Sequence, residues 1–193
     1  MLAKYLKASS DKILFPLGKK IPPWISPNQI TSLGLILSLL VGIVFSLGKI
    51  RLAGFLLLVT GFFDLLDGAY SRSKNKVSKF GAFWDSTVDR YSDLIIMGGI
   101  TMYFAQTNQL LYVLLSILAT AGFMMISYTK ARAENIIPAC NVGLMERPER
   151  VLVLSAGSLM NHLKPTLWLL VILCHQTAIQ RIWFTYKKIR YEE

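Results

Sequence analysis

The sequence predicts an all-α integral membrane protein, with six transmembrane helices preceded by an N-terminal interfacial amphipathic helix. Hydrophobic residues make up 53% of its 193 residues, and the mean hydropathy is +0.47, which is too apolar for an ordinary soluble domain. Apolar runs long enough to cross a bilayer follow one another along the chain. We see no strand-like alternation and no clear internal repeat, so residues 1–193 are predicted to form a single membrane domain.

The first 20 residues combine five lysines with apolar residues at helical spacing. This pattern is typical of a juxtamembrane helix lying in the interface, with a mobile basic tail as the alternative. A break over 21–27 contains three prolines and the interfacial Trp24. The transmembrane core is expected over 28–184. Its six spans are predicted at 28–47, 52–72, 81–104, 110–132, 146–160 and 165–184, and the fifth has an uninterrupted apolar part of only about ten residues.

The basic residues predict the orientation of these spans. The net charge is +10, but the lysines and arginines lie in the links between apolar runs, so they indicate membrane topology and not nucleic-acid binding. With both termini in the cytoplasm, the outer loops hold only Lys49, Arg51 and Lys164, and the other 18 of the 21 basic residues lie at or near the cytoplasmic side. We therefore expect a multi-pass protein of the cytoplasmic membrane whose site faces the cytoplasm.

Four carboxylates lie within the second and third expected spans, where a lipid-facing helix should have none. Asp64 and Asp67 share one helix face, and so do Asp85 and Asp89. In antiparallel helices joined by the basic link 73–80, Asp64 and Asp89 both lie about 12 Å from the cytoplasmic helix ends, at about 1.5 Å per residue. Each isolated carboxylate at membrane depth is unfavourable by about 2.5–3.5 kcal/mol, so a cluster needs a compensating cation. Hard oxygen ligands favour magnesium, manganese or calcium.

An alternative assigns these carboxylates to ordinary helix ends, paired with Arg72, Lys79 and Arg90. It explains neither the shared helix face nor the matched depth of the pairs. Gly68 and Gly81 also favour a ligand site, since a mid-helix glycine is unfavourable by about 1 kcal/mol but lets a ligand approach the backbone.

The spacing of these residues resembles the signature of the CDP-alcohol phosphatidyltransferases, DxxDGxxARx8GxxxDxxxD. Every spacing agrees, and the one departure is Ser71, where the family usually has alanine. The matching residues are Asp64, Asp67, Gly68, Ser71, Arg72, Gly81, Asp85 and Asp89. Serine is nearly as small as alanine, so close helix packing is preserved. The family architecture of six transmembrane helices behind an interfacial helix is similar to the pattern of the whole chain.

The resemblance implies that an acceptor hydroxyl attacks the β-phosphorus of a CDP-linked lipid and releases CMP. By the family pattern, Asp64, Asp67 and Asp85 hold two Mg²⁺ or Mn²⁺ ions. Asp89 is a further ligand or a near neighbour of these ions, and it is also the general base. Residues that line the nucleotide pocket would be Gly68, Ser71, Arg72 and Gly81. The donor would be CDP-diacylglycerol or its ether-linked counterpart CDP-archaeol, and the sequence leaves the linkage open. Family members are commonly homodimers.

A second basic cluster bears on the acceptor. Lys130 follows Ser127 by three residues at the end of the fourth span, and Arg147 precedes Arg150 by three at the start of the fifth. These segments are similar to those of the phosphatidylinositol-phosphate and archaetidylinositol-phosphate synthases. That resemblance implies that Ser127, Lys130, Arg150 and an arginine near the end of the last helix contact inositol 1-phosphate. The last of these is Arg181 or Arg190, with Arg181 the better match.

Other functions remain open at this point. Glycerol 3-phosphate also carries a phosphate and is the chief alternative acceptor, and lysines or arginines at cytoplasmic helix ends are expected for topology alone. A cation transporter could also bury carboxylates between helices, but it would more often show broken helices or inverted repeats.

Overall fold

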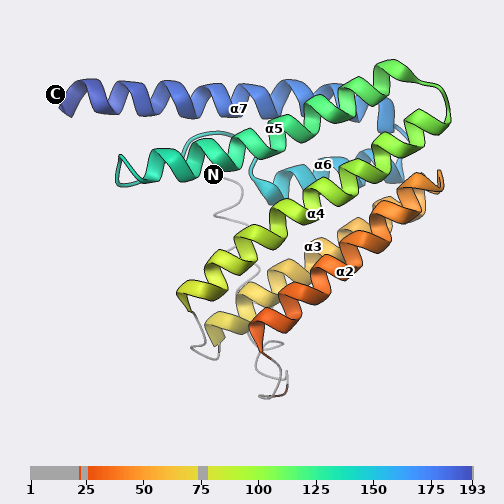
Figure 1. The fold of residues 1–193 in the computed structure, drawn as a ribbon, viewed down its shortest axis with the longest axis horizontal. Coiled ribbons are helices and arrows are strands. Elements are labelled where there is room, and N and C mark those ends of the chain that lie inside the picture. The colour runs from red at the N-terminus through yellow and green to blue at the C-terminus, as the bar shows by residue number, and fades with distance from the viewer. Residues whose placement is uncertain (1–21, 23–25, 74–77, 193) are drawn as a thin grey trace.

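The fold consists of packed helices. The computed structural model describes residues 22, 26–73 and 78–192, so the predicted interfacial helix over 1–20 lies outside the described residues. The side chains of Asp67, Ser71 and Arg72 are outside the description as well, and their predicted roles stay predictions. The described elements are all α-helices: α2 (Pro27–Ser46), α3 (Ile50–Ser73), α4 (Lys79–Gln106), α5 (Leu110–Glu134), α6 (Arg147–Leu159) and α7 (Leu163–Glu192) (Figure 1).

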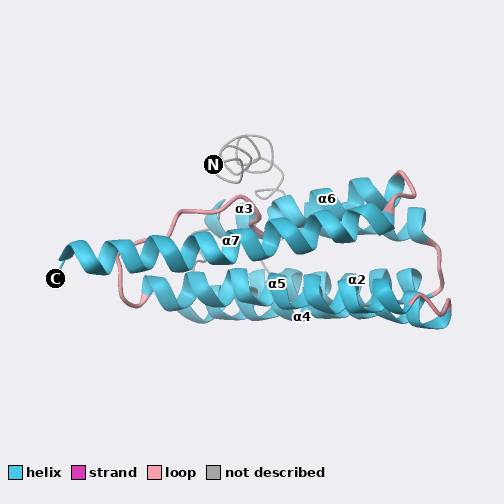
Figure 2. Ribbon diagram, turned by 90° about the horizontal axis from the view of Figure 1, so that it is seen from above, coloured by secondary structure: helices cyan, strands magenta, loops and turns pink. Residues whose placement is uncertain are grey.

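The six described helices pack as a closed ring. Helix α2 contacts α3 and α4, α4 contacts α5, α5 contacts α7, α7 contacts α6, and α6 returns to α3. Seen from above, α3, α6 and α7 form one layer and α2, α4 and α5 form the other (Figure 2). Residues on facing helices of the two layers can therefore meet in the interior of the ring.

Four of the described helices are long and apolar enough to cross a membrane: Pro27–Ser46, Ile50–Tyr70, Leu110–Glu134 and Leu163–Tyr191. Helix α4 has 28 residues, but five of its first 15 residues are charged. Helix α6 has 13 residues and rises only roughly 20 Å, less than the ~30 Å hydrocarbon core. Length and composition thus support a multi-pass membrane protein with four spans and leave the predicted count of six as a proposal.

Local sequence determines where α2 begins. Ser26 Oγ accepts from the backbone N–H of Gln29 at 3.3 Å, and Gln29 Oε1 accepts from the backbone N–H of Ser26 at 2.8 Å. Pro27 follows at the first helical position, where its missing N–H is not needed. This reciprocal cap begins the helix close to the residue 28 predicted from the apolar run.

Glycines let α2 and α4 approach closely. A Cβ atom at Gly99 of α4 would collide with the backbone carbonyl of Gly42 in α2. Elsewhere on α2, a Cβ at Gly34 would lie 3.5 Å from Oδ1 of Asp64 in α3. The glycines of α2 therefore let both α3 and α4 pack closely against it. These are the two helices that carry the carboxylates.

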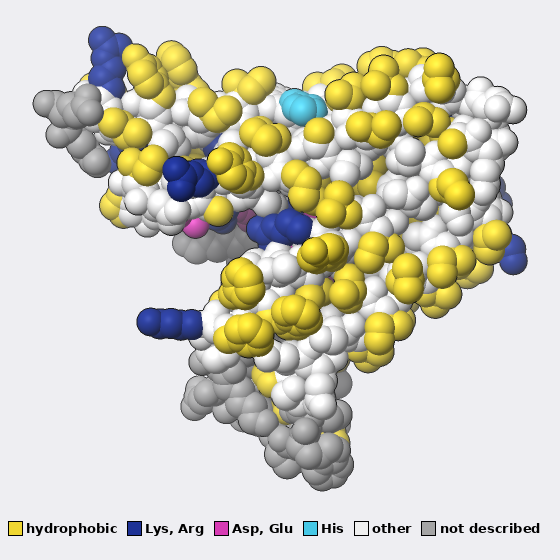
Figure 3. All heavy atoms as spheres, in the orientation of Figure 1, with side chains coloured by type: hydrophobic (Ala, Val, Ile, Leu, Met, Phe, Trp, Pro, Cys, Tyr) yellow, Lys and Arg dark blue, Asp and Glu magenta, His cyan; other side chains and the backbone are white. Residues whose placement is uncertain are grey.

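The interior and the outer surface are both apolar. The buried core includes Phe45, Met97 and Leu170, contributed by α2, α4 and α7. Exposed large hydrophobic side chains cover the outward faces of the helices, as the space-filling view shows (Figure 3). An apolar outer surface on packed helices is what contact with lipid tails requires.

Candidate active site

Two of the predicted carboxylates converge on one guanidinium. Asp64 of α3 and Asp89 of α4 both pair with Nη1 of Arg147, at 2.5 Å from Asp64 Oδ2 and 2.7 Å from Asp89 Oδ1. The helical periodicity of each segment, together with the close approach of α3 and α4 to α2, brings these two side chains together. Asp85 lies one turn nearer the start of α4 and is exposed.

The space between Asp64 and Asp89 suits a cation, because two carboxylates face it and Arg147 supplies positive charge there. Oxygen donors of this kind also suit magnesium or manganese. Among the described side chains, which exclude that of Asp67, no three Asp, Glu, His or Cys residues form a group that could hold a metal ion. A divalent ion would therefore compete with Arg147 for the two carboxylates.

The sequence places Arg147 in the second basic cluster and gives no sign of its contact with the carboxylates of Asp64 and Asp89. Asp93 follows Asp89 by four residues, on the same face of α4. In the structure it pairs with Nη2 of Arg150 at 3.1 Å and lies 4.0 Å from Nε of Arg147. The periodicity of α4 was a signal for Asp93, whereas nothing local signals the contact of α6 with α3.

Arg150 is fixed between three helices. Besides Asp93 of α4, it donates from Nη1 to the backbone carbonyl of Phe123 in α5 at 3.0 Å, and its guanidinium lies 4.5 Å from the centre of the Phe123 ring. Only 3% of its surface is exposed. A cation held this firmly is preorganised for a ligand, since its geometry does not have to change on binding.

Lys130 and Arg181 meet at Glu146. Oε1 of Glu146 accepts from Nζ of Lys130 at 3.2 Å and from Nη2 of Arg181 at 3.3 Å. Lys130 lies near the end of α5, Arg181 is 1% exposed on α7, and Glu146 is the residue immediately before α6. Arg190 is exposed, about two and a half turns beyond Arg181. Of the two candidate arginines, the structure therefore places Arg181 beside Lys130.

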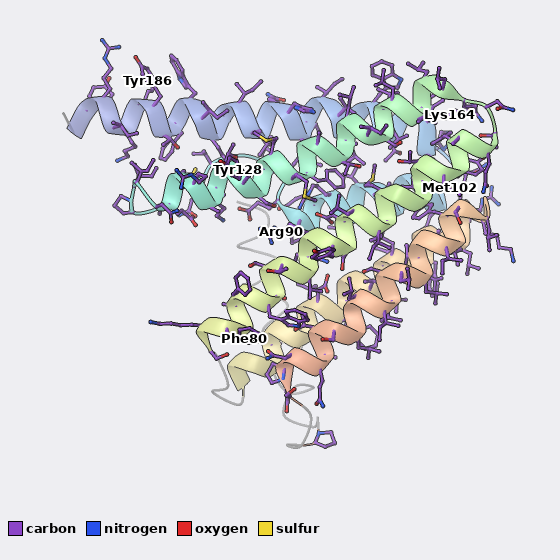
Figure 4. All side chains as sticks on the ribbon, viewed as in Figure 1. Phe80, Arg90, Met102, Tyr128, Lys164 and Tyr186 are labelled. Atoms are coloured by element: carbon purple, nitrogen blue, oxygen red, sulfur yellow. The ribbon has the colours of Figure 1, made fainter. Side chains whose placement is uncertain are left out.

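A cavity of about 200 Å³ connects Asp89 with the predicted acceptor residues. It lies between the two helix layers, and Figure 3 shows charged side chains in the hollow where α4 diverges from α5 and α7. Arg90, labelled in Figure 4, marks the α4 side of this cavity. The lining consists of Asp89, Arg90, Asp93, Ile126, Ser127, Lys130, Glu146, Arg147, Pro148, Arg150 and Arg181.

The lining carries five basic and three acidic side chains, an excess of two positive charges. The candidate base Asp89 and the candidate acceptor residues Ser127, Lys130, Arg150 and Arg181 all lie in it. The cavity can therefore hold a small dianionic ligand beside a carboxylate.

The predicted nucleotide residues Gly68 and Gly81 lie outside this lining. The Gly81 N–H donates to Oγ of Ser78, the cap of α4, at 2.9 Å, and a Cβ at Gly81 would lie 3.4 Å from Oδ1 of Asn28. A second cavity of about 460 Å³ opens nearby, lined by Asn28, Gln29, Ser32, Leu33, Ile36, Phe80 and Trp84. Gly81 thus belongs to the start of α4, close to the start of α2.

A sequence model described as CDP-alcohol phosphatidyltransferase matches residues 24–180. The chain belongs to the CDP-alcohol phosphatidyltransferase family. It is therefore a phospholipid-synthesising transferase, and the prediction drawn from the carboxylate signature is confirmed.

Curated relatives of this family cover most of the chain. The archaetidylinositol phosphate synthase of Pyrococcus horikoshii is 39% identical over 166 residues, which are 86% of this chain and 86% of the relative. The phosphatidylinositol phosphate synthase of Streptomyces avermitilis is 34% identical over 200 residues, covering 94% of this chain and 81% of the relative.

Solved structures of the family share the fold. The phosphatidylinositol phosphate synthase of Mycobacterium tuberculosis with CDP-DAG bound has a TM-score of 0.83 and 27% identity, covering 91% of this chain and 94% of that one. The same enzyme in complex with manganese and citrate has a TM-score of 0.82, covering 90% and 88%. Similarity over nearly the full length extends to α5, α6 and α7, which carry four of the five basic residues of the cavity.

Proposed function

We propose that this enzyme transfers the phosphatidyl or archaetidyl group of a CDP-linked lipid to a hydroxyl of inositol 1-phosphate and releases CMP. The observation that carries the proposal is that Asp89 shares one cavity with Lys130, Arg150 and Arg181. A phosphorylated alcohol in this cavity would place its phosphate on the cations and a hydroxyl near the carboxylate. The relatives named as inositol-phosphate lipid synthases support the same acceptor.

In this proposal the chain's own residues bind, orient and accept a proton. Lys130, Arg150 and Arg181 hold the acceptor's phosphate, and Ser127 lies beside them. Asp89 takes the proton of the attacking hydroxyl. The new bond forms between that oxygen and the lipid-linked β-phosphorus, and the bond from this phosphorus to the CMP oxygen breaks. CMP leaves with the electron pair.

Two divalent ions fit the proposal, with Asp64, Asp67, Asp85 and Asp89 as their ligands. When bound, they supply positive charge that neutralises the diphosphate and the leaving CMP. The facing carboxylates of Asp64 and Asp89 support these two residues as ligands. The manganese complex of the Mycobacterium tuberculosis enzyme supports a divalent metal. Arg147 has to release these carboxylates when ions bind. The nucleotide pocket is proposed to include Gly68, Ser71, Arg72 and Gly81.

The proposed setting is the cytoplasmic membrane, with residues 1–193 as one domain, both termini and the active site on the cytoplasmic side, and the enzyme as a homodimer. Helices α4 and α6 complete the proposed six spans in this arrangement, with the interfacial helix over 1–20. The distribution of basic residues supports the orientation, because Lys187, Lys188 and Arg190 lie at the end of α7, while only Lys49 and Arg51 lie near the α2–α3 turn.

A panel of acceptors tests the proposal. Purified enzyme receives CDP-diacylglycerol or CDP-archaeol and Mn²⁺, and CMP release is compared for inositol 1-phosphate, glycerol 3-phosphate, serine and free inositol. Each charge-assisted contact to the phosphate is worth about 1.5–3 kcal/mol, so two contacts predict a kcat/KM for free inositol at least about 100-fold lower than for inositol 1-phosphate. Preferred use of glycerol 3-phosphate would instead identify a phosphatidylglycerol-phosphate synthase.

A further inference from the structure

Glu146 occupies a position that the proposed reaction does not explain. Its Oε1 atom lies between Nζ of Lys130 and Nη2 of Arg181, at 3.2 and 3.3 Å. These are two of the cations that are proposed to hold the acceptor's phosphate. A phosphate oxygen that binds both cations must therefore replace the carboxylate of Glu146.

The backbone position of Glu146 leaves its side chain available for this contact. Glu146 is the N-cap residue of α6 in an extended conformation (φ −73°, ψ 176°), and it makes no side-chain hydrogen bond to its own helix. Side chains at this position commonly accept from the first backbone N–H groups of the helix. That of Glu146 reaches into the cavity and is 34% exposed.

Arg181 is held from the opposite side. Its Nε donates to the backbone carbonyl of Val142 at 3.0 Å and its Nη1 to that of Ile126 at 2.6 Å. Two carbonyl contacts and nearly complete burial keep the guanidinium in place. When a ligand binds, Glu146 is therefore the side chain that moves, and Arg181 stays.

We propose that Glu146 is a specificity-determining residue, a built-in singly charged anion that excludes phosphodiesters from the Lys130–Arg181 pair and admits phosphomonoesters. The proposal rests on the proposed function, because it takes the Lys130–Arg181 pair to be the acceptor-phosphate site. When a singly charged anion displaces Glu146, one negative charge beside Lys130 and Arg181 replaces another. The net electrostatic contribution to binding is therefore small. A phosphomonoester is largely a dianion at pH 7, and it brings a second charge to a cavity with two excess positive charges.

This exclusion is useful at a membrane surface. Headgroup phosphates of most phospholipids are singly charged diesters, and they are far more concentrated near the cavity than any soluble acceptor. Without a competing anion, Lys130 and Arg181 would bind them. A singly charged diester therefore does not displace the Glu146 carboxylate, whereas a doubly charged monoester does.

Methyl phosphate and dimethyl phosphate test the proposal as a matched monoester and diester. Both are titrated calorimetrically into detergent-solubilised enzyme with Mn²⁺ and CDP-diacylglycerol present. The variants are Glu146→Gln, which keeps the side-chain shape and removes the charge, and Glu134→Gln, which removes an exposed charge one turn beyond Lys130 that does not line the cavity. Thermal unfolding of each variant checks that it folds.

In the wild type we expect binding of methyl phosphate and little binding of dimethyl phosphate. Glu146→Gln should tighten dimethyl phosphate binding by about 10-fold or more, as expected when one competing charged contact is removed. Glu134→Gln should change either affinity by less than about threefold. Glu146→Ala is a second neutral variant and should admit the diester as well.

The sign of the effect separates this role from a structural one. If Glu146 merely positions Lys130 and Arg181, its neutralisation weakens the binding of both probes, and the proposal is overturned. Unchanged affinities overturn it as well. A wild type that shows no preference for methyl phosphate would instead contradict the acceptor-phosphate site, and with it the proposed function.

Discussion

Replacing Lys130 by alanine should impair acceptor binding strongly and folding hardly at all. In the structure Lys130 pairs with Glu146, and both side chains are 34% exposed. An ion pair this accessible to water contributes about 0–1 kcal/mol to stability. The same ammonium, placed on an acceptor phosphate, makes a charge-assisted contact worth about 1.5–3 kcal/mol. The expected loss of binding free energy is larger than the expected loss of stability. The single variant Lys130→Ala can therefore distinguish a role in acceptor binding from a role in folding.

The assay is steady-state CMP release by wild type, Lys130→Ala and Arg132→Ala. For Lys130→Ala, kcat/KM for inositol 1-phosphate should fall about 10- to 150-fold, while KM for the CDP-lipid stays within about twofold. Arg132 is the matched control, since it lies two residues further along α5, is exposed and does not line the cavity. Equal losses for both substrates, or an unchanged acceptor KM, would refute the assignment of Lys130 to the acceptor phosphate.

Three further predictions follow from the site and the packing. Asp89→Asn should lower CMP release by about 10²–10⁴-fold while CDP binding persists, and normal turnover would exclude Asp89 as the base. Arg147→Ala should tighten Mn²⁺ binding, measured by electron paramagnetic resonance, because a competing cation is removed; weaker binding would contradict that competition. Gly99→Ala should destabilise the protein in thermal unfolding by about 1–3 kcal/mol because its Cβ meets the backbone of Gly42, whereas Gly98→Ala, whose Cβ meets open space, should be neutral.

The convergence of Asp64 and Asp89 could be predicted from the sequence because it depends on local periodicity. Asp64 lies nine residues before the end of α3 and Asp89 lies ten residues after the start of α4. Because both helices pack on α2, residues at such matched positions come together. No tertiary information was needed beyond the pairing of α3 and α4 with α2. The family signature contained the same information.

Contacts between distant helices could not be predicted in the same way. Arg147 meets Asp64 across 83 positions of sequence, and only the packing of α6 against α3 explains it. Glu146 is similar, because its two partners come from α5 and α7. The choice between Arg181 and Arg190 depended on the rotation and height of α7 beside α5, which an apolar run alone does not determine.

The number of spans is hard to predict from hydropathy because two of the helices, α4 and α6, contain charged residues within the bundle. In α4, the acidic residues that serve the site also reduce the apolar length of the helix. In α6, a 13-residue helix carries Glu149 and Arg150, both buried by neighbouring helices. Charged residues shorten the apolar part of both helices. A count of spans from hydropathy alone therefore omits α4 and α6, although both belong to the helical ring.

Retention of the acceptor's phosphate in the lipid product tests the central claim most directly. Enzyme, CDP-diacylglycerol and Mn²⁺ are mixed with inositol 1-phosphate that carries a radiolabelled phosphate, and the lipid and aqueous phases are separated. If inositol 1-phosphate is the acceptor, the amount of label that enters the lipid phase equals the amount of CMP released. Release of CMP without label in the lipid, or preferential reaction with free inositol added in competition, would contradict it.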